Sequence, residues 1–219
     1  MSVKENTVSA ENQMVNSSNL SFLGNPNAPL KILVLGNSIT RHGPKADIGW
    51  DGDWGMAASA PDKDYVHLLY KMFTAAGQDV YMRIRQSAHW ERNFLDKNCL
   101  SAYADDRDFG ADLIIFRLSE NVPYENAPYF ADAVKQFLSY LNAKPGKVIF
   151  TTGWWDRPEL DEPIRQVAKD MGCPCAETLC ADPSMKAYGK FQHSGVAAHP
   201  GDSGMEMIAQ KIFACFAEI

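Results

Sequence analysis

Short apolar runs alternate with amphipathic segments along this chain, and this alternation limits the possible folds more than any other feature. Strands are expected at about Leu30–Leu35, Val80–Ile84, Asp112–Leu118, Lys147–Thr152 and, weakened by Pro174, Cys173–Leu179. Helical spacing predicts helices at about Tyr65–Phe73, Leu100–Arg107, Ala127–Leu141, Glu159–Met171 and from Asp202 onward. Strands and helices that alternate in this way favour an α/β fold with three α/β/α layers around a flavodoxin-like parallel sheet of about five strands.

Composition indicates one globular domain. The chain has 219 residues, of which 46% are hydrophobic, and residues 1–28, rich in Asn, Ser and Glu, are expected to be a flexible lead-in to a single domain at 29–219. The net charge of −6 argues against a nucleic-acid partner. No apolar run reaches the roughly 20 residues of a membrane span. No secretory signal is visible, which favours a cytoplasmic protein, or a periplasmic or secreted one if a signal was removed.

The five cysteines show no regular spacing and do not indicate a disulfide framework. Cys173 and Cys175 are separated by one residue, which fits neither a redox CxxC pair nor a usual zinc site. Buried free thiols are therefore expected, and neither a metal nor a cofactor.

Three polar residues are expected at one edge of the predicted sheet. Ser38 follows the first strand after Gly36, Asn121 follows the third, and His199 lies just before the last helix. In the flavodoxin-like strand order, the first and third strands are neighbours, so their carboxyl ends meet where such folds bind ligands. Taken alone, each residue has a simpler interpretation: a helix-capping serine, a turn asparagine and a surface histidine.

Considered together, these positions resemble the motifs of the GDSL, or SGNH, hydrolases. Gly36-Asn37-Ser38-Ile39-Thr40 resembles the nucleophile block, Ser119-Glu120-Asn121 the block with the oxyanion-binding asparagine, and His199-Pro200 the block with the catalytic histidine. The resemblance implies an esterase in which Ser38 attacks the ester and His199 is the general base. It also implies that the Ser38 N–H and the Asn121 amide bind the oxyanion.

The chain departs from the family pattern at two places. Val196 occupies the position where the family has an aspartate, so a backbone carbonyl or a relocated carboxylate would have to orient His199; Asp202, Glu120 and Glu91 remain open as that carboxylate. The loop after the second strand has no oxyanion glycine, and a backbone N–H of Ser87 or Ala88 is the expected replacement.

Loops at the same edge carry aromatic residues that could line a substrate pocket. Trp50 and Trp54 follow the first strand, and Trp154 and Trp155 follow the fourth, although paired tryptophans can equally well belong to the core. His193 lies close to His199 in sequence and is a further pocket candidate.

The predicted function is hydrolysis of a short-chain acyl ester through an acyl-enzyme, and tryptophan-bearing loops suit a carbohydrate acetyl ester. Two alternatives remain: a non-catalytic carbohydrate-binding protein with this fold, favoured by Val196, and an acyltransferase that uses the same residues. The expected partner is thus a small-molecule or carbohydrate ester.

Overall fold

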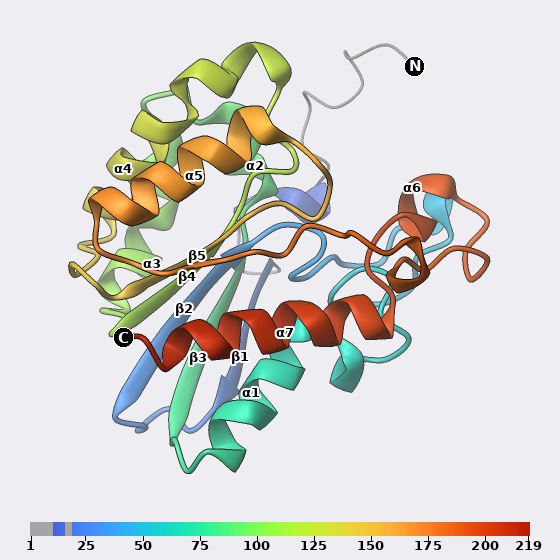
Figure 1. The fold of residues 1–219 in the computed structure, drawn as a ribbon, viewed down its shortest axis with the longest axis horizontal. Coiled ribbons are helices and arrows are strands. Elements are labelled where there is room, and N and C mark those ends of the chain that lie inside the picture. The colour runs from blue at the N-terminus through green and yellow to red at the C-terminus, as the bar shows by residue number, and fades with distance from the viewer. Residues whose placement is uncertain (1–10, 16–18) are drawn as a thin grey trace.

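The computed structural model describes residues 11–15 and 19–219, which form one twisted sheet covered on both faces by helices (Figure 1). The strand order is β1-β3-β2-β4-β5-β6, and all neighbouring pairs are parallel except β1 with β3. The strands are β1 (Leu20–Gly24), β2 (Leu30–Gly36), β3 (Val80–Gln86), β4 (Leu113–Arg117), β5 (Val148–Thr151) and β6 (Cys175–Ala176).

Successive side chains of each buried strand point to opposite faces of the sheet and so contribute to two separate hydrophobic cores. The larger helices are α1 (Tyr65–Ala75), α4 (Phe130–Tyr140), α5 (Pro158–Asp170) and α7 (Asp202–Phe216), and the shorter ones are α2 (Ala88–Asn93), α3 (Ala104–Asp108) and α6 (Ser194–Ala197). In β2, Leu33 and Leu35 pack toward α4 and α5, whereas Ile32 and Val34 pack toward α1 and α7. Figure 1 shows α4 and α5 on one side of the sheet and α1 and α7 on the other.

The predicted three-layer α/β/α fold is confirmed, because β2 to β6 form a parallel five-stranded sheet in the expected order. The predicted lead-in is wrong in its second half. Leu20–Gly24 pairs with β3 as an antiparallel edge strand, and Asn19 is buried. Residues 1–10 and 16–18 of that segment lie outside the described residues.

One local expectation is also corrected: the stretch after β3, expected to be a loop, contains α2. Helix α1 is capped by Asp64, whose side chain accepts a hydrogen bond from the His67 N–H. The backbone N–H and the hydroxyl of Ser59 both donate to Asp202.

Within residues 11–15 and 19–219, none of the helices combines the length and the apolar character needed to cross a membrane.

Candidate active site

Ser38 lies in a tight turn at the carboxyl end of β2. The Asn37 carbonyl accepts hydrogen bonds from the backbone N–H groups of Thr40 and Arg41, at 2.9 and 3.0 Å. Gly36 is required by this turn, since a Cβ at that position would lie 1.7 Å from Thr40 Oγ1. Among the described residues, the Ser38 N–H meets no acceptor, so it remains available to a ligand.

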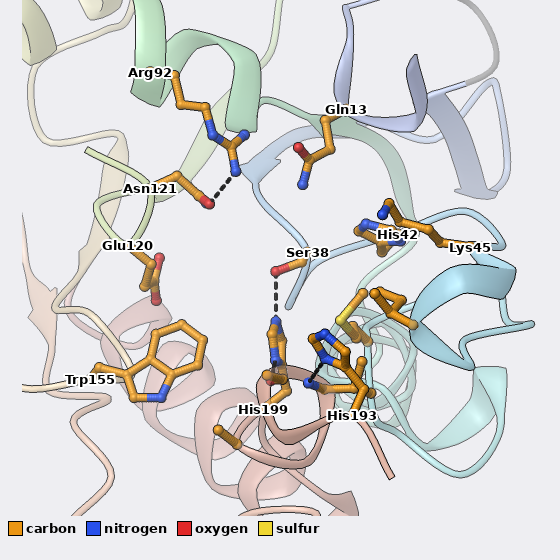
Figure 2. A pocket seen from close by; sticks show the side chains of 15 residues that line it. Gln13, Ser38, His42, Lys45, Arg92, Glu120, Asn121, Trp155, His193 and His199 are labelled. Carbon is orange, nitrogen blue, oxygen red and sulfur yellow. Dashed lines mark hydrogen bonds between the residues drawn. The ribbon is translucent and has the colours of Figure 1, made fainter. Parts of the chain in front are cut away.

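Ser38 and His199 form a hydrogen-bonded pair although 161 positions separate them (Figure 2). Ser38 Oγ lies 2.8 Å from His199 Nε2, and His199 Nδ1 lies 2.7 Å from the Gly195 carbonyl oxygen. A carbonyl can only accept, so Nδ1 carries the ring proton and Nε2 is left free to accept the serine proton. In a Ser-His-Asp triad an aspartate accepts the hydrogen bond from this ring nitrogen. Here a backbone carbonyl of helix α6 accepts it instead.

Burial makes His199 a weak base. Desolvation lowers the pKa of His199 to about 4, and the charges of His42 and Arg117 add to this effect. The hydrogen bond to Gly195 and the charge of Glu120 oppose it without reversing it. The ring is therefore neutral, and able to accept a proton, down to acidic pH.

A cavity of about 600 Å³ opens over the pair. Trp155 forms one wall and contacts the His199 ring edge to face, with centroids 5.2 Å apart. The cavity is lined by polar and basic side chains and by a few apolar ones: Gln13, His42, Lys45, Ile48, Met56, Arg92, Glu120, Asn121, His193 and Val196.

Asn121 reaches the same cavity from the end of β4, with both ends of its amide already bonded. Nδ2 donates to Glu91 Oε2 at 2.6 Å, and Oδ1 accepts from Arg92 Nη2 at 2.6 Å. An amide nitrogen carries two hydrogens, so the bond to Glu91 leaves one for a further acceptor.

Behind Ser38 and Asn121 lies a buried network that joins two carboxylates. Asn37 Nδ2 donates to Glu91 at 3.1 Å and to Glu120 at 2.5 Å. Glu120 also accepts from Arg117 at 2.8 Å and from the Trp154 N–H at 3.0 Å. Neither carboxylate bonds to His199, and Asp202 bonds to Ser59 instead, so none of the three takes the place of the missing triad acid.

The amides expected as the second oxyanion donor are engaged elsewhere. The Ser87 N–H donates to the Gly36 carbonyl at 2.6 Å, and the Ala88 N–H donates to Gln86 Oε1 at 2.8 Å. Ser87 is fully buried and does not line the cavity. The assignment of an oxyanion amide to Ser87 is therefore wrong, because its N–H already bonds to Gly36 and joins the end of β3 to the end of β2.

The pocket candidates divide in the same way. His193 lines the cavity, but Trp50 and Trp154 are buried in the core with their indole N–H groups on the His42 and Ala198 carbonyls. Trp54 packs on Trp50 and also lies outside the lining. In the loop after β5, Trp155 lines the cavity, whereas its neighbour Trp154 is buried in the core.

Comparison with family models and with curated proteins finds no match, whereas solved structures with the same fold are found. A Clostridium thermocellum family 3 carbohydrate esterase superposes with a TM-score of 0.58 at 13% identity, covering 86% of this chain and 96% of that one. A lipase/acylhydrolase from Enterococcus faecalis gives 0.54 at 16%, covering 84% and 94%. The psychrotrophic esterase EstA from Pseudoalteromonas sp. gives 0.52 at 12%, covering 86% and 97%.

The fold is therefore that of the SGNH hydrolases, the class of GDSL-like esterases and lipases that the sequence motifs resemble. At these identities the superposition identifies the fold, and the chemistry rests on the residues of this chain.

Within the described part of the chain, no group of three or more His, Cys, Asp or Glu side chains is arranged to hold a metal ion.

Proposed function

We propose that this protein is a serine esterase whose nucleophile is Ser38 and whose general base is His199. The observation that carries the proposal is the chain of contacts from Ser38 Oγ to His199 Nε2 and from Nδ1 to the Gly195 carbonyl. A serine hydroxyl is a weak nucleophile unless a neighbouring base takes its proton, and this geometry supplies that base in the correct tautomer.

In the proposed reaction, Ser38 Oγ attacks the ester carbonyl carbon while His199 Nε2 takes the hydroxyl proton. The carbonyl oxygen becomes an oxyanion, which the Ser38 N–H and the remaining Asn121 Nδ2 hydrogen stabilise. When the intermediate collapses, His199 returns its proton to the leaving alcohol. Water then attacks the acyl-enzyme, with His199 again accepting a proton, and the acid is released.

The proposed substrate is a short-chain acyl ester, such as an acetyl ester of a carbohydrate. Trp155 offers an aromatic face beside the dyad, and sugar rings pack well on such faces. Two of the structural neighbours are described as carbohydrate esterases, of families two and three, which supports this class.

A fluorophosphonate probe tests the nucleophile, since it bonds covalently only to an activated serine. The neighbouring esterase EstA is described as inhibited by monoethylphosphonate, a related group. Wild type should be labelled on Ser38 and should hydrolyse p-nitrophenyl acetate. Ser38→Ala, with an unchanged melting temperature, should do neither.

Equal turnover by Ser38→Ala would refute the assignment. Absence of both labelling and turnover in wild type would favour the carbohydrate-binding alternative. Acyl transfer to an added alcohol in preference to water would favour the transferase.

A further inference from the structure

Glu91 is buried beside the site, does not line the cavity, and contacts two of its components. Its Oε1 accepts from Asn37 Nδ2 at 3.1 Å, and its Oε2 accepts from Asn121 Nδ2 at 2.6 Å. Asn37 directly precedes Ser38 in the nucleophile turn. One carboxylate thus holds the residue behind the nucleophile and the side chain that we place at the oxyanion.

The next residue of α2, Arg92, holds the opposite end of the Asn121 amide. Arg92 Nη2 donates to Asn121 Oδ1 at 2.6 Å, as Figure 2 shows. Turning the amide over would set Nδ2 against the guanidinium donor and Oδ1 against the Glu91 oxygen. Two consecutive residues of α2 therefore allow only one orientation of the Asn121 amide.

We propose that Glu91 is a positioning residue of this esterase: its ionised carboxylate, together with Arg92, orients the Asn121 amide toward the oxyanion and fixes Asn37 behind Ser38. This inference rests on the proposed function. Glu91 does not touch the substrate; it acts through Asn37 and Asn121.

The charges around Glu91 make its role depend on pH. The groups that face it are Glu120 beyond β4, Arg92 on its own helix, and the amides of Asn37 and Asn121. Burial, followed by the charge of Glu120, raises the pKa of Glu91 to about 7. Burial alone would also raise the pKa of Glu120, but Arg117, the Trp154 N–H and Asn37 hold it below its ordinary value.

Only the ionised form of Glu91 offers two charged oxygens that accept and do not donate. A protonated Glu91 is uncharged and carries an O–H on one oxygen, which weakens the hydrogen bond from Asn37 or Asn121 to that oxygen. Turnover should therefore rise with pH through about 7, above the limb that His199 sets.

The test compares wild type with Glu91→Gln, which keeps the shape but has only one accepting oxygen. We expect kcat for p-nitrophenyl acetate to fall up to about a hundred-fold, with little change in KM, because the misplaced groups act in the transition state. The rise in kcat near pH 7 should disappear. Asp106→Asn is the matched control: Asp106 is equally buried but pairs with Arg83 and Arg85, away from the cavity, so its kcat profile should keep the rise.

A folded Glu91→Gln variant with the wild-type kcat would overturn the inference, as would one whose lower kcat still rises near pH 7. If Glu91→Gln does not fold, Asn121→Ala supplies the test: the rise should shrink in it, and an unchanged rise overturns the inference. In each of these cases wild type still labels with the fluorophosphonate. Loss of that labelling would instead refute the proposed function.

Discussion

The partner of His199 Nδ1 helps to set the pH below which the proposed base becomes protonated. A carboxylate would stabilise the imidazolium, whereas the Gly195 carbonyl does so only weakly, and burial opposes the charge further. The base is active when neutral, so its acid limb should lie near its pKa of about 4 rather than near the usual 6.5.

The pH dependence of kcat/KM measures this limb. In Glu91→Gln the rise near pH 7 that we assign to Glu91 should be absent, so the acid limb of His199 can be measured alone. We expect hydrolysis by that variant to persist at about pH 5, where an ordinary histidine would be mostly protonated. An acid limb at or above 6.5 would contradict the weak-base assignment and would point to a carboxylate acting on the ring.

Asn121 should contribute to the transition state rather than to substrate binding. Removing one oxyanion donor typically costs about 2.7–4 kcal/mol, so Asn121→Ala should lower kcat about 10²–10³-fold and leave KM nearly unchanged. Asn93→Ala is the matched control, because Asn93 lies at the end of α2 outside the cavity lining and, among the described residues, its side chain donates to His89. A rise in KM alone would make Asn121 a binding residue.

Residues that belong to a local motif were predictable from the sequence, and residues placed by tertiary contact were not. Gly36, Ser38 and His199 stand in recognisable blocks, and the structure brings Ser38 and His199 together. The Gly195 carbonyl has no side chain to signal its role. The sequence left Glu91 open only as a carboxylate for His199, and the fold shows instead that Glu91 and Arg92 are buried against Asn121.

At the scale of elements, the parallel strands and the large helices follow from the sequence because each carries a clear hydrophobic period. Two elements lack that signal. β1 is a half-exposed edge strand that pairs with β3, so only part of its surface needs to be apolar. α2 is six residues long and carries charged side chains inward, which reverses the usual pattern for an amphipathic helix.

His199 lies just before α7, and Gly204 in the first turn of that helix is closely packed. A Cβ at Gly204 would lie 2.6 Å from the Met185 carbonyl oxygen and 2.7 Å from the Trp154 ring. Gly204→Ala should therefore push α7 outward, at a cost of about 1–3 kcal/mol in unfolding free energy, and reduce kcat by moving His199.

Ser203→Ala, at an exposed position in the same helical turn, serves as the control and should leave both quantities almost unchanged. Urea unfolding and p-nitrophenyl acetate kinetics measure the two effects. Wild-type stability and kcat in Gly204→Ala would show that the helix start adjusts freely and does not position the base.

For the molecule as a whole, His199 and Glu91 make stability respond to pH in opposite directions. The pKa of His199 is lowered in the folded state, so its contribution to the free energy of unfolding is fully present above about pH 6.5 and is lost as pH falls toward 4. The pKa of Glu91 is raised in the folded state, so its contribution to the free energy of unfolding is fully present below pH 4.5, its ordinary pKa, and is lost as pH rises through about 7. The ionised Glu91 that we assign to catalysis is thus the form that stabilises the fold least.

Glu91→Gln should therefore change the pH dependence of stability in a defined way. The variant loses hydrogen bonds at every pH, but it no longer carries a buried carboxylate that must ionise above pH 7. The difference in unfolding free energy between wild type and Glu91→Gln should decrease from pH 5 to pH 8 by up to about 3 kcal/mol, the value of the Glu91 pKa shift. Urea unfolding of both proteins at the two pH values measures this difference, and the contribution of His199 cancels between them. A difference that stays constant from pH 5 to pH 8 would mean that Glu91 keeps one charge state in the fold, and the rise in kcat near pH 7 would then need another group.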